Sequence, residues 1–510
     1  MAAVITFIGL FIGLYIARFY YCYFTRPNPL PGPFPLPFLG TLLQIKVDPH
    51  RWFDKHLEKS LDLWEFYLGN FRVIVIRNSD YLDKLDIFKP FDKTKFFKRY
   101  FTGSDNFNTT SSFIFNNDYH KWRRNRQFLT KVLMSKKFQY GFIDSVQGIF
   151  KRAEKQWEGK NSVTFDLSKW MSCYKTDISS ITLIGRPSYS LALFDNNDNS
   201  ESTKSLVEES LQLTKAVPAY MAMLTLMLYV PKYVYSIVIL GFKTMMKNNV
   251  MFNGTIDHII KKRRKEIEDG LHVNFNFLDL LLISNSSHDS QNFEDDELPM
   301  NDSEIKAILA EVLAASIEST VSAVCLLVYN VAKNPNVLEK IRAEILIVFG
   351  LDENITINYE NLERCHYIEA VINESLRYST PLPANLRVLE GDETIGDHYW
   401  PSGTWFWADN ERIMNHPNNW NKPEYFNPDR FLSKELGGTG ENIRKTMFIP
   451  FGGGVRMCPG RNLALFEIKI LIILFYRKHS FVLVNEKEPV KYYFNGSKRI
   501  YDLMVRLIQK

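Results

Sequence analysis

Cys458 has a side chain that can ligate a soft metal, and the residues around it could hold that side chain as an anion. It lies in the stretch Phe451-Gly452-Gly453-Gly454-Val455-Arg456-Met457-Cys458-Pro459-Gly460. A thiolate binds iron only while it stays deprotonated, and a helix N-terminus, backbone N–H groups and the metal itself favour the anion. A run of helix formers over 461–476 supplies the helix start, and the glycines let the backbone approach a flat ligand closely. The alternative is an ordinary buried cysteine before a helix.

This loop resembles the cysteine-ligand loop of the cytochrome P450 superfamily, whose pattern is Phe-x-x-Gly-x-Arg-x-Cys-x-Gly. Every fixed position of the pattern is met. The resemblance implies heme b (iron protoporphyrin IX) as the cofactor and Cys458 as its axial ligand. It also implies that Phe451, Gly452, Arg456 and Gly460 lie against the heme.

A second motif is Ala314-Ala315-Ser316-Ile317-Glu318-Ser319-Thr320, which resembles the family's Ala/Gly-Gly-x-Asp/Glu-Thr-Thr/Ser. Glu318 matches the acid, Ser319 replaces the usual threonine and Ser316 replaces the usual glycine. The resemblance implies that Glu318 and Ser319 relay protons during oxygen activation, with Thr320 as the next candidate alcohol. Serine keeps the hydroxyl but lacks the β-branch that fixes its rotamer, and Ser316 is expected to narrow the oxygen groove. The alternative is a polar stripe on a buried helix.

Two further motifs concern the support of the cysteine loop. Glu374-Ser375-Leu376-Arg377 matches the family's Glu-x-x-Arg, and Phe426-Asn427-Pro428-Asp429-Arg430-Phe431 matches its Phe-x-Pro-x-Arg-Phe. A glutamate and an arginine at i and i+3 share one helix face, although such pairs are commonly exposed. The resemblance implies that Arg430 joins Glu374 and Arg377 in a buried ionic triad with a structural role.

The heme propionates call for cationic and neutral donors. Trp122 and Arg126 match the family's Trp-x-x-x-Arg and share one helix face at i and i+4. Their indole and guanidinium groups are both donors, which suits an anionic propionate. Arg456 is the third candidate. Arg387, six residues after Pro381, is a fourth, and it is less firmly placed because the spacing from the Glu-x-x-Arg motif to the proline is one residue longer than the family's.

Several elements must position these residues. Asn301–Asn334 reads as one long helix, capped by Asn301 with Glu304 and ended by Pro335. A second helix fits 364–378, residues 61–77 read as a hairpin, and loops with short strands fill much of 381–450. The sequence therefore predicts a mainly α fold with small β-sheets (α+β), and the resemblance implies the P450 fold.

Composition limits the function classes. The 510 residues are 45% hydrophobic with a net charge of +5, which does not suggest nucleic acid binding. Five cysteines without paired spacing argue against a disulfide framework. We expect a transmembrane anchor over 1–25, a proline-rich hinge over 26–40 and one heme-binding catalytic domain over 41–510. The hinge could also be a binding ligand, but its place after an anchor favours a stiff spacer.

The anchor also predicts a location. Arg18 and Arg26 follow the apolar run and no charged side chain precedes it, so the positive-inside rule places the body in the cytosol. The expected setting is the endoplasmic reticulum membrane, crossed once. Residues 217–242 form another apolar stretch, interrupted by Pro231. We expect a membrane-dipping lip over the substrate entrance there, with a buried core helix or a second span as alternatives.

The motifs occur in family order, and the resemblance implies a heme-thiolate monooxygenase. Such an enzyme inserts one oxygen atom of O2 into a lipophilic substrate, here a fatty acid, sterol or terpenoid. No flavin or NADPH module is present, so electrons would come from a separate NADPH-cytochrome reductase, with cytochrome b5 as a second candidate partner. Basic residues that could steer an acidic partner, or form only a solvated face, are Lys121, Arg123, Arg124, Lys131, Lys136, Lys137, Arg444, Lys445 and Arg461.

Two other functions stay open at this point. One is a reductase-independent heme-thiolate isomerase or dehydratase that acts on hydroperoxides. Such relatives often alter the groove alcohol, and the retained Glu318 and Ser319 speak against this function. The other is a non-catalytic heme carrier.

Overall fold

The long helix α13 (Asp302–Ala332) forms where the sequence predicted it. Its capping box is complete: the Asn301 side chain accepts the Glu304 N–H at 3.0 Å, and the Glu304 carboxylate accepts the Asn301 N–H at 2.9 Å. Pro335 then begins α14 (Pro335–Phe349). By length and composition α13 could cross a membrane, but 72% of its apolar window is buried inside the protein. It is therefore the core helix of the body.

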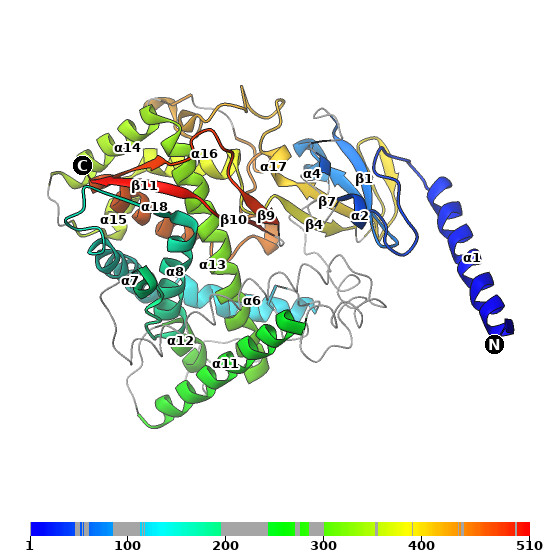
Figure 1. The fold of residues 1–510 in the computed structure, drawn as a ribbon, viewed down its shortest axis with the longest axis horizontal. Coiled ribbons are helices and arrows are strands. Elements are labelled where there is room, and N and C mark those ends of the chain that lie inside the picture. The colour runs from blue at the N-terminus through cyan, green and yellow to red at the C-terminus, as the bar shows by residue number, and fades with distance from the viewer. Residues whose placement is uncertain are drawn as a thin grey trace.

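Five helices of the described body pack against α13, namely α8 (Leu167–Ser179), α11 (Lys243–Glu268), α14, α16 (His366–Tyr378) and α18 (Arg461–Lys478) (Figure 1). The computed structural model describes residues 2–45, 52–53, 55, 61–84, 113–114, 116, 118–194, 243–270, 276–284, 300–351, 355–389, 391–436, 438–439, 443–494 and 497–509. Its further helices are α2 (Leu42–Ile45), α4 (Ser79–Lys84), α6 (Tyr119–Leu133), α7 (Lys136–Glu154), α12 (Phe277–Ser284), α15 (Tyr359–Glu363) and α17 (Asn410–Ile413). A π turn spans Ser180–Ile184, and 3-10 turns span Ser190–Phe194, Pro428–Phe431, Lys434–Leu436 and Gly454–Arg456.

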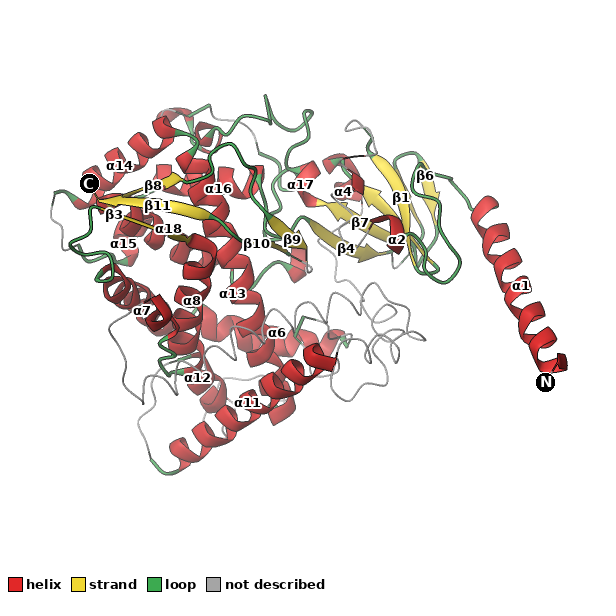
Figure 2. Ribbon diagram, in the orientation of Figure 1, coloured by secondary structure: helices red, strands yellow, loops and turns green. Residues whose placement is uncertain are grey.

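The sheets are small and lie in two parts of the body (Figure 2). Near the anchor, β1 (Leu63–Leu68), β2 (Phe71–Ile76), β7 (Trp405–Asp409) and β4 (Ala384–Val388) form one sheet in that order, with β2 and β7 parallel. The second sheet has the order β3 (Ser162–Asp166), β11 (Met504–Gln509) and β8 (His479–Leu483). Two hairpins pair β5 (Glu393–Ile395) with β6 (His398–Trp400) and β9 (Tyr492–Phe494) with β10 (Lys498–Ile500).

These elements confirm the expected fold class and the expected hairpin. The hairpin over 61–77 is β1 and β2, whose antiparallel register joins Leu63 to Ile76 and Leu68 to Phe71. The helix expected over 364–378 begins at His366, after the short α15. The apolar stretch 217–242 lies outside the described residues, so the expectation of a membrane-dipping lip stays a prediction.

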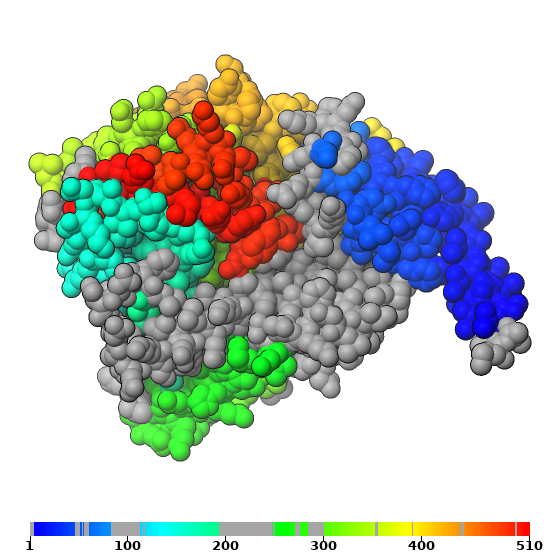
Figure 3. All heavy atoms as spheres, viewed as in Figure 1, coloured from blue at the N-terminus to red at the C-terminus, as the bar shows by residue number. Residues whose placement is uncertain are grey.

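The helix α1 (Ala2–Phe24) projects from the body (Figure 3). Its segment Ile5–Phe24 has a mean hydropathy of 1.6, and none of it is buried inside the protein. Its last turns nevertheless contact the body: Tyr15 stacks on Phe38 at 4.1 Å and Tyr20 on Phe34 at 5.5 Å between ring centroids. An apolar helix without core packing fits an anchor.

The proline-rich segment is fixed along β1. The Glu65 N–H donates to the Pro31 carbonyl at 2.9 Å, and the Glu65 carboxylate pairs with Arg26 at 2.6 Å. Gly32 is needed here because a Cβ at this position would lie 1.9 Å from the Glu65 carbonyl oxygen. The expected spacer is thus held against the sheet in this structure.

Candidate active site

Cys458 lies on a tightly closed loop before α18. Its N–H donates to the Phe451 carbonyl at 2.9 Å, so the loop returns on itself across the glycines. Gly452 and Gly454 have φ angles of 71° and 66°, in the left-handed region that favours glycine. A Cβ added to Gly452 would meet only the Asn385 amide nitrogen, at 3.9 Å, so the loop passes beside β4.

The environment of the Cys458 thiol is both enclosed and accessible. Burial raises its pKa, while the backbone N–H of Gly460, the guanidinium of Arg126 and the backbone N–H of Arg461 lower it. The residue still keeps exposed surface. A thiol that lines an internal space explains both observations. The surrounding protein desolvates it, and the space beside it leaves part of its surface accessible. A coordinated metal deprotonates such a thiol outright.

The other cysteines differ from Cys458. Cys173, Cys325 and Cys365 are buried, and burial raises the pKa of Cys173 and of Cys365 to about 12. The remaining one, Cys22, is exposed but lies on α1. Cys458 is therefore the accessible cysteine of the described body, which fits a metal ligand better than a packing residue.

Two arginines and a tryptophan gather beside the loop. The Arg456 guanidinium lies 3.7 Å from the centroid of Trp122, and Arg126 lies 6.0 Å from the same ring. Both Trp122 and Arg126 come from α6, whose N-cap Asp118 accepts the N–H groups of His120 and Lys121. The shared helix face expected for Trp122 and Arg126 thus lies against the cysteine loop.

The charges of this cluster are partly desolvated. Burial lowers the pKa of Arg126, although Cys458 counteracts the shift, and burial lowers the pKa of Arg387 on β4 to about 10. Both residues nevertheless keep part of their surface exposed. They therefore border an accessible space, as the Cys458 thiol does. An anionic group placed there would favour both cations. The thiol, the two cations and the Gly452 backbone therefore fit a heme with its propionates.

The middle of α13 presents an accessible stripe. Ala315 is exposed, and Val312, Ser316 and Ser319 are half-buried, at the i, i+3, i+4 and i+7 spacing of one helix face. Thr320 is buried beside them. A core helix with such a face adjoins an internal space. Among the four residues of this face, Val312 has the largest side chain. This face is consistent with room for a flat cofactor and O2.

The hydroxyls of this face have specific partners. Ser319 donates to the Ala315 carbonyl at 2.7 Å, one turn earlier. Ser316 donates to the Leu313 carbonyl at 3.2 Å and lies 3.3 Å from the Ser179 hydroxyl of α8. The Ser316 hydroxyl is thus held toward α8, and the expected narrowing of the groove stays a prediction.

Glu318 is paired with a residue from the other end of the chain. Its buried carboxylate lies 2.5 Å from Arg499 of β10, which is part of a hairpin packed on α13. The sequence reasoning missed Arg499, because no local pattern links residues separated by 181 positions. It also missed Glu311, whose carboxylate accepts the N–H groups of Phe113 and Ile114 at 2.8 and 2.7 Å.

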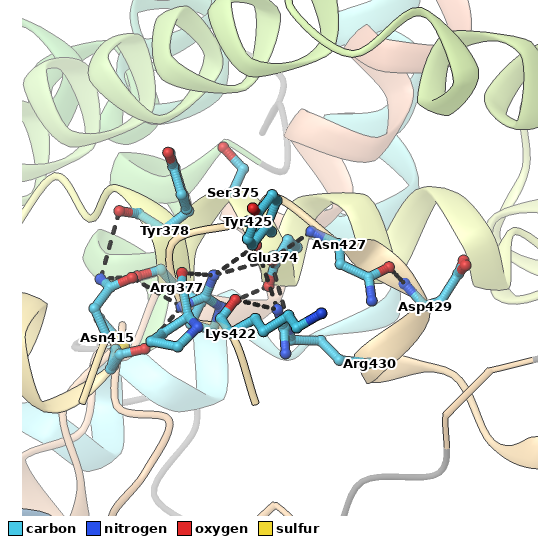
Figure 4. Close-up of polar contacts among 12 residues, drawn as sticks. Glu374, Ser375, Arg377, Tyr378, Asn415, Lys422, Tyr425, Asn427, Asp429 and Arg430 are labelled. Atoms are coloured by element: carbon cyan, nitrogen blue, oxygen red, sulfur yellow. Dashed lines mark hydrogen bonds and ion pairs between the residues drawn. The ribbon is translucent and has the colours of Figure 1, made fainter. Parts of the chain in front are cut away.

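The structure brings the expected ionic triad together in the core (Figure 4). Arg377 makes two contacts with Glu374, at 2.7 and 2.9 Å, and Arg430 reaches Glu374 at 3.2 Å. The three side chains are at most 2% exposed. Glu374 also accepts the Asn427 N–H at 2.7 Å, and Arg377 donates to the Asn415 side chain at 2.8 Å. The triad therefore joins α16 to two later segments of backbone.

A packed path connects this triad to the cysteine loop. Phe431, next to Arg430, lies 4.9 Å from Phe448 between ring centroids, and Phe448 comes three residues before Phe451. The rings of Trp420 and Phe431 are 5.5 Å apart between centroids. The Arg377 guanidinium carbon lies over the Trp420 ring, 5.4 Å from the ring centroid. These contacts can transmit the position of the triad to the loop, which agrees with its expected structural role.

The sequence of this chain is similar to sequences of known proteins. A family model described as Cytochrome P450 matches residues 30–500. Cytochrome P450 705A5 of Arabidopsis thaliana is 26% identical over 58% of this chain, and tabersonine 16-hydroxylase 1 of Catharanthus roseus is 28% identical over 68% of it. These matches cover 55% and 65% of the two relatives, so they span less than two thirds of either. Cytochrome P450 3A9 of Rattus norvegicus is 27% identical over 89% of this chain and 86% of the relative.

Proposed function

The chain belongs to the cytochrome P450 family, and on this premise we propose that it is a membrane-anchored heme-thiolate monooxygenase. It inserts one oxygen atom of O2 into a lipophilic substrate. The single observation that carries the proposal is the geometry at Cys458: an accessible thiol on a closed glycine loop, just before α18, with the Arg126 guanidinium near enough to lower the pKa of the thiol. The relative named as a 16-hydroxylase supports an oxygen insertion of this kind.

The residues of this chain have distinct tasks in the proposed reaction. When bound, heme supplies the activation of O2 and the transfer of one oxygen atom. Cys458 would hold the heme iron through its thiolate. Arg126, Arg387, Arg456 and Trp122 would hold the propionates by charge and hydrogen bonding. Ser319 holds a proton at its hydroxyl on the accessible face of α13, and Glu318 passes protons to that face.

Electrons come from a separate NADPH-cytochrome reductase, with cytochrome b5 as a second donor. The start of α18 lies beside the end of α6, since Asn462 contacts the Met134 sulfur at 3.6 Å. Exposed basic residues lie on these two helices and on α7, namely Lys121, Arg123 and Lys131 of α6, Lys136 and Lys137 of α7, and Arg461 of α18. Arg124 and Arg444 contribute less, because they pair with Glu304 and Asp80. Such a basic surface steers an acidic partner.

The substrate is lipophilic, of the fatty acid, sterol or terpenoid class, and reaches the protein from the membrane. The apolar composition and the anchor support this, and the setting is the endoplasmic reticulum with the catalytic domain in the cytosol. The anchor over 1–25, the proline segment over 26–40 and the catalytic domain over 41–510 divide the chain accordingly.

One experiment separates this function from a hydroperoxide isomerase. The purified chain in lipid vesicles is given a lipid extract with NADPH and a P450 reductase, or with fatty acid hydroperoxides and no reductase. We expect product only in the first case. Turnover of hydroperoxides alone would favour the isomerase, and turnover in neither case would favour a heme carrier.

Replacement of Ser319 by alanine is expected to uncouple the reaction. Heme binding and substrate binding stay near normal because only one hydroxyl is lost. Product formed per NADPH falls, and hydrogen peroxide per NADPH rises toward its limit of one, because the rate of the assisted proton transfer falls by a factor in the ~10²–10⁴ range of general acid–base assistance. The measurement is product and peroxide per NADPH in the reconstituted system. Ser319→Thr is the matched control, and its β-branch should preserve or improve coupling. Equal coupling in the wild type and Ser319→Ala would remove Ser319 from the mechanism and make Thr320 the next candidate.

Deletion of residues 2–25 is expected to release much of the protein from membranes with its heme intact. The deletion removes α1 but keeps Arg26, so the ion pair to Glu65 survives. Some residual binding through 217–242 is expected. The fraction left in the supernatant after a high-salt wash, together with heme content, measures the effect. A truncated chain that remains wholly membrane-bound would show that α1 is not the main anchor.

A further inference from the structure

The acid of α13 is held by a basic residue of the C-terminal hairpin. Arg499 Nη1 lies 2.5 Å from Glu318 Oε1, and the two side chains are 21% and 4% exposed. A carboxylate buried to this degree needs a cation or several hydrogen bonds to stay ionised. Arg499 supplies that cation from a strand that follows the cysteine loop in the chain.

The strand that carries Arg499 is itself fixed. Its neighbour Lys498 donates from its backbone to the Pro381 carbonyl at 2.8 Å and pairs with Glu411 of α17 through its side chain. Burial lowers the pKa of Lys498, but Glu411, Tyr492 and Asp409 together raise it above its ordinary value. Ile500 is buried in the core. Since side chains alternate along a strand, Lys498 and Ile500 hold one face of β10 while Arg499 extends from the other face to α13.

The aromatic neighbour of Arg499 belongs to the same group of charges. Tyr493 is its cross-strand partner, with the guanidinium 5.9 Å from the ring centroid. Burial raises the pKa of Tyr493, Arg499 lowers it and Glu318 raises it further. The hairpin therefore places the Arg499 guanidinium against Glu318 and the Tyr493 ring beside that guanidinium.

The acid and the alcohol of α13 do not contact each other in this arrangement. Ser319 donates to the Ala315 carbonyl, and Glu318 faces Arg499. A proton can pass from Glu318 to the accessible face only after the carboxylate turns away from β10. The ion pair with Arg499 opposes that turn.

We propose that Arg499 is a positioning residue that sets when Glu318 delivers protons. It holds the Glu318 carboxylate toward the β9–β10 hairpin. When the carboxylate is released from Arg499, it takes one proton from solvent water and passes that proton to the accessible face of α13, so each release allows one delivery. This inference rests on the proposed function, since it concerns the timing of protons in oxygen reduction. Arg499 lies outside all the family motifs found in this chain.

The functional arm of the test needs no identified substrate. The full chain, loaded with heme in lipid vesicles, is given NADPH and reductase alone, and the ratio of water to hydrogen peroxide formed from O2 is measured. Arg499→Gln is expected to lower this ratio about tenfold, less than the ~10²–10⁴-fold of a group that transfers protons directly. Arg499→Lys should recover most of the ratio because it keeps the charge. In a Glu318→Gln background, Arg499→Gln should have no further effect.

A second arm is independent of turnover. Backbone amide exchange of the hairpin strands, Tyr492–Phe494 and Lys498–Ile500, should rise severalfold in Arg499→Gln and in Glu318→Gln. Amide exchange in the double variant should be close to that in either single variant, because the loss of one ion pair accounts for both effects. Arg506→Gln is the matched control, since Arg506 is an exposed arginine on β11, the next strand of the chain, which belongs to a different sheet.

The outcomes separate the two levels of the account. Unchanged exchange in both single variants would overturn the link between the hairpin and Glu318. Changed exchange with an unchanged water-to-peroxide ratio would leave Arg499 a purely structural residue and overturn the proposal. A wild-type protein that consumes no O2 with NADPH and reductase, even after the lipid extract is added, would refute the proposed function instead, and the proposal with it, while the exchange arm would still report on the ion pair.

Discussion

Replacement of Cys458 by histidine is expected to abolish the red-shifted Soret band of the ferrous carbonyl complex. That band requires a thiolate opposite carbon monoxide, and imidazole does not donate electron density in the same way. The loop should otherwise persist, because the Cys458 backbone N–H still donates to the Phe451 carbonyl. The difference spectrum of dithionite-reduced membranes with and without carbon monoxide measures the band.

The control for this variant is Cys22→Ser, which removes the other exposed cysteine without touching the loop. It should keep the full band. Heme content of both variants, read by pyridine hemochrome, distinguishes a changed ligand from lost heme. Survival of the band in Cys458→His would move the ligand to Cys173, Cys325 or Cys365.

Replacement of Glu374 by glutamine should destabilise the fold by roughly 3–5 kcal/mol, the usual cost of breaking a buried ion pair on one side. Glutamine keeps the shape of the side chain but removes the charge shared by Arg377 and Arg430. Both guanidinium groups would then be buried without their carboxylate. Heme should be lost as well, because the path through Phe431 and Phe448 no longer holds the cysteine loop in place.

The midpoint of urea unfolding, followed by tryptophan fluorescence in detergent, measures this effect. Glu339→Gln is the matched control, since Glu339 is exposed on α14 and should shift the midpoint little. An unchanged midpoint for Glu374→Gln would mean that the triad neither stabilises the fold nor supports the loop.

The parts of the fold that were predictable have local causes. The capping box at Asn301 and the proline at 335 act within a few residues, so they fixed the bounds of α13 to within two residues. The hairpin of β1 and β2 follows from two short, nearly continuous apolar runs joined by a two-residue turn. The triad was identifiable because two of its members are spaced i and i+3 and the third belongs to a recognisable motif.

Other features depend on contacts that no local pattern encodes. The pairs Glu318–Arg499 and Arg124–Glu304 join segments 181 and 180 positions apart. The hydrogen bond from the Phe113 N–H to the Glu311 carboxylate depends on tertiary packing. Every segment of backbone offers N–H groups, so the sequence does not indicate which of them Glu311 binds. The attachment of the proline segment to β1 is similar, because proline density predicts stiffness but not what the segment lies against.

The origin of the inserted oxygen tests the central claim most directly. The reconstituted chain, with NADPH, reductase and a lipid extract, is incubated under isotopically heavy O2 in ordinary water, and the products are analysed by mass spectrometry. The account predicts one heavy oxygen atom in each product molecule and none in products of the Cys458→His variant. Product whose oxygen comes from water or from an added hydroperoxide would contradict a monooxygenase.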